Sequence, residues 1–233
     1  MIDAQNTYIV AAVRDWNRRL FDETTPELTG SWHFAATPDE LDTLLEKLPA
    51  PRAVFFPHWN AIIPERIHTL HECVGFHMTD LPFGRGGSPL QNLIARGIRS
   101  TMLSAIRITR ELDAGPVYLK RPLNLEGAAE EIFIRASRLA FGMMREMIAG
   151  WPQPVPQEGH PEHFARRTPG MSRIEPTQDL ETLFDHVRML DAKGYPPAFL
   201  THGGMRYEFS RAALRDGHIT ADVRITRAQE DES

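Results

Sequence analysis

A run of four apolar residues between two prolines constrains the fold of this chain more than any other feature. Ala53-Val54-Phe55-Phe56, between Pro51 and Pro57, lacks the polar and apolar alternation of a strand with one wet face. A continuous apolar run is typical of a strand covered on both faces, as in parallel sheets with helices on either side. The preceding segment, Thr37 to Leu48, begins with a threonine cap, a proline and two acids, and its leucines recur at helical spacing. Alternating strand and helix patterns predict an α/β fold.

The patterns continue to Gly150 and then change. Strand-like runs cover residues 8–13, 31–35, 73–78, 102–108 and 117–119, and apolar spacing between residues 126 and 148 predicts a long helix. Six prolines from residue 151 to residue 176 exclude a helix or a central strand there. A helical pattern and three strand-like runs follow and predict a small, mainly β C-terminal subdomain. We expect a main domain over 1–150, a proline-rich linker over 151–176 and the subdomain over 177–233.

The composition narrows the functional classes. The chain has 233 residues and a formal net charge of −5, so it is a poor candidate for binding phosphate backbones. Its one cysteine, Cys73, excludes an internal disulfide framework and a multi-cysteine metal site. We find no signal peptide and no apolar run of the roughly 18 residues that a membrane span needs. A cytoplasmic protein without a membrane partner is expected.

A glycine-rich loop precedes a helix start at Ser88-Pro89. Gly84-Arg85-Gly86-Gly87 offers backbone N–H groups beside the positive end of a helix, which is the chemistry of an anion site. The spacing matches neither the phosphate loop of nucleotide hydrolases nor the dinucleotide fingerprint. An anion site and a tight turn therefore explain the loop equally well.

Two titratable residues stand near predicted strand ends. His77 follows a probable parallel strand, at the edge where open α/β sheets bind ligands. Asp113 lies in the turn Leu112-Asp113-Ala114-Gly115-Pro116, just before another strand. Alone, each residue has a structural explanation as good as a catalytic one. The histidines near Cys73 match no metal-ligand spacing, so no metal is expected.

The combination of these motifs resembles the formyltransferase family. The resemblance rests on His77, the Leu81-Pro82 pair, the Arg85-Gly86 pair with Pro89, and Leu112 to Pro116. It covers residues 53–148 well, and it is weaker over 187–199. It implies a Rossmann-like domain over 1–150 with a shortened N-terminal half. It also implies transfer of a formyl group from 10-formyltetrahydrofolate to a primary amine.

The resemblance assigns roles to particular residues. His77 would relay a proton or stabilise the oxyanion, and Asp113 would orient the imidazole. The family's asparagine two residues before the histidine falls on Gly75, so we expect Asn60, Thr79 or a backbone N–H to replace its hydrogen bond. The pterin slot would be formed by Ile62, Ile63, Leu81, Pro82, Glu111 and Leu112.

The amine acceptor is predicted from charge and from the loop. The acidic chain argues against tRNA, and a nucleotide-linked amino sugar, as in bacterial surface-sugar pathways of the pseudaminic-acid type, fits better. Its binding residues would be Thr79, Arg85, Gly86, Gly87 and Tyr195, with no nucleic-acid partner and a possible homodimer. The alternatives are a methionyl-tRNA-type or amino-acid N-formyltransferase, an inactive folate-binding relative and a formyl hydrolase.

Overall fold

The computed structural model of the chain describes residues 7–176 and 179–228. Its internal contacts divide the chain into two compact units. The first contains Met1–Gly86, Thr101–Leu123 and Ile134–His163, and the second contains Gly87–Ser100, Asn124–Phe133 and Phe164–Ser233. Both units are therefore assembled from segments that alternate along the chain. The three successive segments expected from composition stay a prediction about how the chain is organised.

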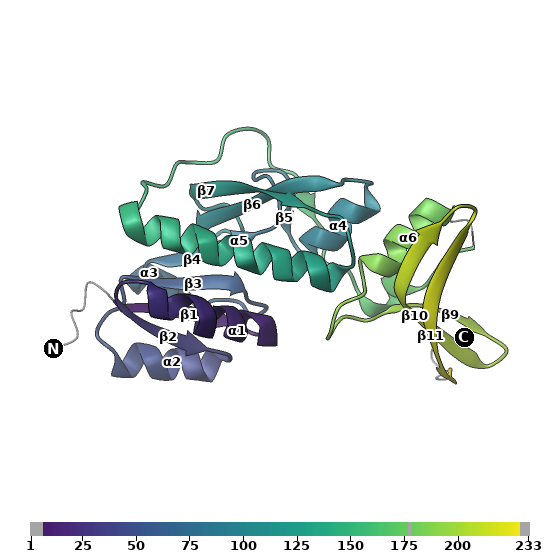
Figure 1. Ribbon diagram of the computed structural model, residues 1–233. Coiled ribbons are helices and arrows are strands. Elements are labelled where there is room, and N and C mark those ends of the chain that lie inside the picture. Colours follow the sequence, from purple (N-terminus) through teal and green to yellow (C-terminus); the bar gives the residue numbers. More distant parts are fainter. Residues whose placement is uncertain (1–6, 177–178, 229–233) are drawn as a thin grey trace. The chain divides into compact units, whose positions relative to one another are not determined.

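The first unit is built on a six-stranded sheet (Figure 1). Its strands lie in the order β2-β1-β3-β4-β6-β7. The pairs β1–β2, β1–β3 and β3–β4 are parallel, whereas β4 and β6 are antiparallel. The bounds are β1 Thr7–Ala12, β2 Ser31–Ala35, β3 Ala53–His58, β4 Cys73–His77, β6 Ser100–Arg107 and β7 Val117–Asn124. Residues 53–56 are fully or almost fully buried, as their apolar run predicts. The predicted α/β fold with a parallel-rich sheet is confirmed.

Helices connect the parallel strands. Helix α2 begins as its sequence predicts, because the hydroxyl of Thr37 accepts a hydrogen bond of 3.2 Å from the backbone N–H of Glu40. Leu41 of this helix is buried against the sheet residues Ile9 and Val54 in one apolar cluster. The helical bounds are α1 Asp15–Thr24, η2 Thr25–Glu27, α2 Pro38–Lys47, α3 Glu65–Leu70 and α5 Ala129–Gly150.

Helix α4 (Pro89–Ala95) begins at the helix start predicted at Ser88-Pro89. Leu90, Leu93 and Ile94 are buried, as their spacing predicts. Ser88 stands at the cap position, but its side chain makes no capping hydrogen bond, because its backbone adopts a left-handed φ of 50°. Its hydroxyl instead accepts a hydrogen bond of 3.1 Å from the backbone N–H of Arg167.

The second unit carries the predicted small sheet. Strands β9 (Ala198–His202), β10 (Met205–Arg215) and β11 (His218–Arg227) form an antiparallel sheet in the order β11-β10-β9. Arg188 of α6 (Leu180–Arg188) is 2% exposed and donates hydrogen bonds to Asp185 and to the carbonyl of Leu125. A buried arginine is tolerated here because carboxylate and carbonyl groups surround it. The remaining elements are β5 Arg85–Gly86, β8 His163–Phe164 and η3 Pro169–Ser172.

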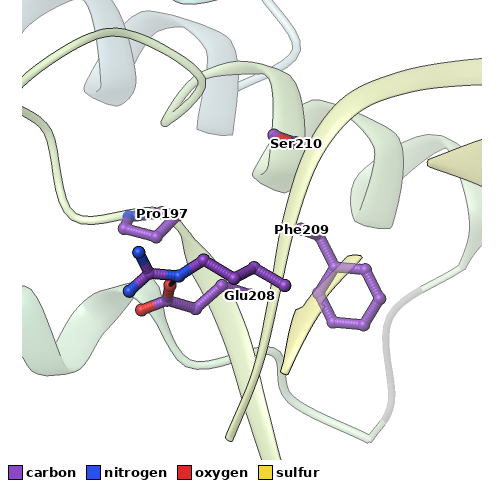
Figure 2. A pocket seen from close by; sticks show the side chains of 5 residues that line it. Pro197, Glu208, Phe209 and Ser210 are labelled. Carbon is purple, nitrogen blue, oxygen red and sulfur yellow. Dashed lines mark hydrogen bonds and ion pairs between the residues drawn. The ribbon is translucent and has the colours of Figure 1, made fainter. Parts of the chain in front are cut away.

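A shallow hollow of about 320 Å³ lies on this small sheet (Figure 2). It is lined by Pro197, Glu208, Phe209, Ser210 and Arg224. The carboxylate of Glu208 accepts hydrogen bonds of 2.9 Å from Arg206 and 3.0 Å from Arg224. The charged groups that line the hollow thus compensate one another.

None of the helices in the described part of the chain has the length and apolar character of a membrane span.

Candidate active site

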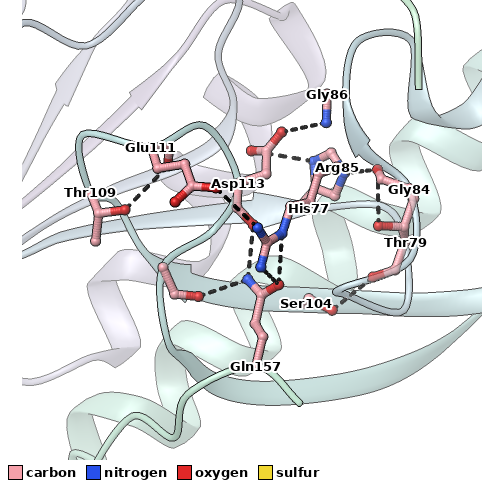
Figure 3. A network of polar contacts seen from close by, with 11 residues as sticks. His77, Thr79, Gly84, Arg85, Gly86, Ser104, Thr109, Glu111, Asp113 and Gln157 are labelled. Atoms are coloured by element: carbon pink, nitrogen blue, oxygen red, sulfur yellow. Dashed lines mark hydrogen bonds and ion pairs between the residues drawn. The ribbon is translucent and has the colours of Figure 1, made fainter. Parts of the chain in front are cut away.

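His77 is held by the loop that follows its own strand (Figure 3). It is the last residue of β4 and is 9% exposed. Its Nε2 lies 2.7 Å from the carbonyl oxygen of Gly84, and because a carbonyl only accepts, Nε2 carries a proton and donates it. The loop is fixed in turn by the hydroxyl of Ser104, which donates a hydrogen bond of 2.7 Å to the carbonyl of Thr79.

Asp113 comes to His77 from the turn between β6 and β7. Its Oδ1 lies 3.6 Å from Nδ1 of His77, although 36 residues separate the two positions in sequence. Its Oδ2 accepts a hydrogen bond of 2.9 Å from the backbone N–H of Gly86. The imidazole therefore lies between a carbonyl and a carboxylate, so it is oriented and can carry positive charge without losing a partner. The predicted pair is brought together.

Arg85 has a different environment from the one predicted. Its side chain is 11% exposed, and its guanidinium donates to Gln157 Oε1 through Nε at 3.1 Å and Nη2 at 2.9 Å. Its Nη1 donates to Glu111 at 3.3 Å. The group predicted to hold a diphosphate is thus engaged in bonds between loops.

The glycine-rich loop is a turn rather than an open anion site. The backbone N–H of Arg85 donates to the carbonyl of Glu162 at 2.9 Å, that of Gly86 to Asp113, and that of Gly87 to the carbonyl of Phe164 at 3.1 Å. A diphosphate would have to displace each of these acceptors. Of the two explanations that the sequence allowed, the structure favours the tight turn.

The residues predicted for the pterin slot differ in exposure. Ile62 and Leu112 are 94% and 69% exposed, which is unusual for large apolar side chains. Leu81, in contrast, is 2% exposed and belongs to the core. Pro82 and Ile63 are half-buried, and Glu111 is exposed.

Of three other predicted residues, Asn60 and Tyr195 lie outside the network around His77, and Thr79 belongs to it (Figure 3). Asn60 is exposed in the loop after β3, and among the described residues no hydrogen bond joins it to His77 or Asp113. The hydroxyl of Thr79 is buried and donates to the carbonyl of Gly84 at 3.4 Å, so it supports the loop instead of facing a ligand. Tyr195 belongs to the second unit, where its ring stacks on Phe133. Within residues 7–176 and 179–228, no three His, Cys, Asp or Glu side chains are placed to hold a metal.

Apolar side chains cover the position that the family's asparagine would take. Gly75 and His77 lie on the same face of β4 because successive strand residues alternate. A Cβ at Gly75 would lie 3.4 Å from Cγ1 of Ile108 and 3.8 Å from Cγ1 of Ile106. A longer polar side chain at residue 75 would therefore meet Ile108.

Sequence reasoning missed Gln157. Its Nε2 donates hydrogen bonds of 2.8 Å to the carbonyls of Asp113 and Gly115, while its Oε1 accepts from Arg85. The prolines around it exclude regular structure, so the sequence predicts a linker here. The available signal was a glutamine in a proline-rich segment, because its amide can make four hydrogen bonds. A segment predicted to be a linker is not expected to use them.

The sheet and its turns define an α/β protein with a paired imidazole and carboxylate at a strand end, and comparisons with known proteins identify the family. The chain is 46% identical to methionyl-tRNA formyltransferase from Clostridium thermocellum, covering 95% of this chain and 99% of that one with a TM-score of 0.92. A family model described as the C-terminal domain of methionyl-tRNA formyltransferase matches residues 169–226. The chain belongs to the formyltransferase family. Members of this family use the predicted cosubstrate, 10-formyltetrahydrofolate.

More distant relatives differ from this chain in length and carry different activities in their names. Methionyl-tRNA formyltransferase from Corynebacterium urealyticum is 27% identical over 194 residues, which cover 76% of this chain and 58% of that protein. This chain thus spans a little over half of that relative. A 4-N formyltransferase from Francisella tularensis is 9% identical over 86% of this chain and 94% of its own, with a TM-score of 0.68, which shows a shared fold alone.

These comparisons overturn the predicted acceptor. The nucleotide-linked amino sugar, and with it the absence of a nucleic-acid partner, was the wrong prediction, because the strong similarity is to methionyl-tRNA formyltransferases. The error has a physical reason. A net charge is an average over the chain, whereas phosphate binding depends on local charge. Residues 205–227 contain five arginines and three acids although the whole chain carries −5.

Proposed function

We propose that this protein transfers the formyl group of 10-formyltetrahydrofolate to the α-amino group of methionyl-tRNA. The observation that carries the proposal is the 46% identity to the Clostridium thermocellum protein over nearly the full length of both chains. The contact of 3.6 Å between His77 and Asp113 supports it, because a formyl transferase needs a group that can hold a proton beside the reacting carbonyl.

The geometry suggests what each group does. The attacking amine forms a bond to the formyl carbon, and negative charge develops on the formyl oxygen. The proton on Nε2 of His77 now points at the carbonyl of Gly84, and the formyl oxygen would replace that carbonyl as its acceptor. When Nδ1 carries a second proton, Asp113 stabilises the charged ring, which strengthens the hydrogen bond from Nε2 to the oxyanion. The bond between the formyl carbon and N10 then breaks, and N10 takes up the proton that the attacking amine releases.

The exposed apolar side chains support a folate site. Ile62 and Leu112 offer apolar area to a pterin ring, which stabilises binding by roughly 25 cal/mol per Å² buried. The loops that carry them belong to the same unit as His77. We propose Ile62, Ile63, Pro82 and Leu112 as the apolar wall, and the core residue Leu81 as its support.

The test uses the purified chain, 10-formyltetrahydrofolate and initiator methionyl-tRNA, with formyl-methionine measured after deacylation. A panel of nucleotide-linked amino sugars is assayed in parallel by mass spectrometry. We expect formylation of the tRNA alone, and its complete loss in His77→Asn with the fold retained. Asp80→Asn, which removes an exposed partner of Lys120, is the matched control and should stay active. Formylation of a sugar but not of tRNA, or full activity of His77→Asn, would refute the proposal.

A further inference from the structure

The amide of Gln157 joins three segments of the first unit that are far apart in sequence (Figure 3). Its NH₂ group donates to two carbonyls of the turn that carries Asp113, and its carbonyl accepts twice from Arg85. Both donors and both acceptor positions of the amide are therefore used. Every partner of the amide belongs to the loops around His77.

The turn that Gln157 holds is strained. Asp113 has a φ of 53°, a left-handed conformation that residues with a Cβ adopt at a cost. Such a conformation persists only where neighbouring groups fix it. The carbonyl of Asp113 itself and that of Gly115 are the groups that Gln157 binds, so the amide holds the backbone on both sides of Ala114.

Arg85 extends the same connection to the loop on the other side of Asp113. Gly86, the next residue, donates its N–H to Oδ2 of Asp113, while Arg85 is held by Gln157. Gly86 thus binds the side-chain carboxylate of Asp113, and Gln157 binds its backbone carbonyl. Its other oxygen is left to face the imidazole of His77.

We infer that Gln157 is a positioning residue: it sets the geometry of Asp113 against His77 without touching a substrate. The segment around it is tied to the same unit by a two-way bridge between Val155 and Val117, with hydrogen bonds of 2.7 and 2.8 Å. The proline-rich segment is therefore part of the active-site framework. The kinetic test of this inference rests on the proposed function, because it measures formyl transfer.

Two variants of equal side-chain length test the inference. Gln157→Glu can still accept from Arg85 but cannot donate to either carbonyl, whereas Gln157→Met loses both sets of bonds. If only the bond to Arg85 mattered, the glutamate variant would be fully active. Because the turn is what needs to be held, we expect both variants to lose at least about tenfold in kcat, while KM for folate and tRNA changes less than threefold. Gln153→Ala, an exposed glutamine of the same segment, is the control.

A second readout does not depend on activity. The ring cross peak of His77 in a ¹³C–¹H NMR spectrum at one fixed pH, assigned by its loss in His77→Asn, reports the contact with Asp113. We expect it to move in both Gln157 variants and to stay in place in Gln153→Ala. If the wild type transfers no formyl group, the proposed function fails and this spectrum alone decides the positioning role. An unmoved cross peak, wild-type kcat in Gln157→Glu, or a loss confined to KM would overturn the inference.

Discussion

Two histidines stand at the ends of neighbouring parallel strands and have opposite environments. His77 ends β4 between the carbonyl of Gly84 and the carboxylate of Asp113, which are both hydrogen-bond acceptors. His58 ends β3, where burial and the nearby positive charge of Arg14 lower its pKa to about 4. Its ring packs edge-on against Trp16, with 5.9 Å between centroids. Strand ends place both imidazoles at one edge of the sheet, but the loops around them decide their chemistry.

Removing the carboxylate beside His77 tests whether its surroundings set its chemistry. In Asp113→Asn the amide keeps the shape but cannot stabilise a charged imidazole, so we expect kcat to fall by about 10³-fold. Single-turnover formyl transfer measures the loss. The matched control is Asp80→Asn, and a drop of less than tenfold in Asp113→Asn would mean that His77 works without its partner.

The turn that carries Asp113 should tolerate no added side chain at Gly115. A Cβ at Gly115 would overlap the carbonyl oxygen of Arg107, which is backbone and cannot move aside. We expect Gly115→Ala to lower the free energy of unfolding by about 3 kcal/mol. Gly142→Ala is the control, because a Cβ there meets nothing within 4 Å and alanine suits a helix better than glycine. Equal stability of the two variants in urea unfolding would contradict the prediction.

The sequence predicted more of the fold than of the site. Strand β3 and helix α2 follow from an apolar run and a cap, which are local signals. His77 and Asp113 were identified through a family motif, because no local sequence pattern predicts a contact between residues that are 36 positions apart. The bond between Arg85 and Gln157 could not be predicted, because the two residues are 72 positions apart in the sequence. A side chain whose partners are remote in sequence looks free until the fold supplies them.

His58 offers a test through pH. Its folded pKa of about 4 lies below the ordinary value of about 6.5, so the unfolded chain binds more protons between these values. The stability that its neutral form contributes is full above pH 6.5 and is lost as pH falls toward 4. At pH 5 the loss relative to pH 7 should be about 2 kcal/mol greater in the wild type than in His58→Gln.

Urea unfolding at pH 7 and pH 5 measures this difference, and groups common to both proteins cancel. His68→Gln, on α3, serves as the control for the loss of a histidine elsewhere in the same unit. If His58→Gln loses stability between the two pH values as steeply as the wild type, burial is not what governs this ring. The surroundings of His58 at the end of β3 would then not determine its protonation.

The last prediction concerns kcat after substitution of Gly75, the residue of β4 at which the family has an asparagine. Gly75 shares a face with His77, and Ile108 occupies the space beyond it, so an asparagine at residue 75 needs that space before its amide can face the formyl oxygen. In an Ile108→Ala background, we expect Gly75→Asn to raise kcat about tenfold, because an added donor stabilises the oxyanion. Gly75→Ala in the same background fills the Cβ position without a donor, and its Cβ lies at ordinary contact distance from its neighbours. If both substitutions leave kcat alike, Nε2 of His77 and the backbone already supply all the hydrogen bonds that the transition state uses.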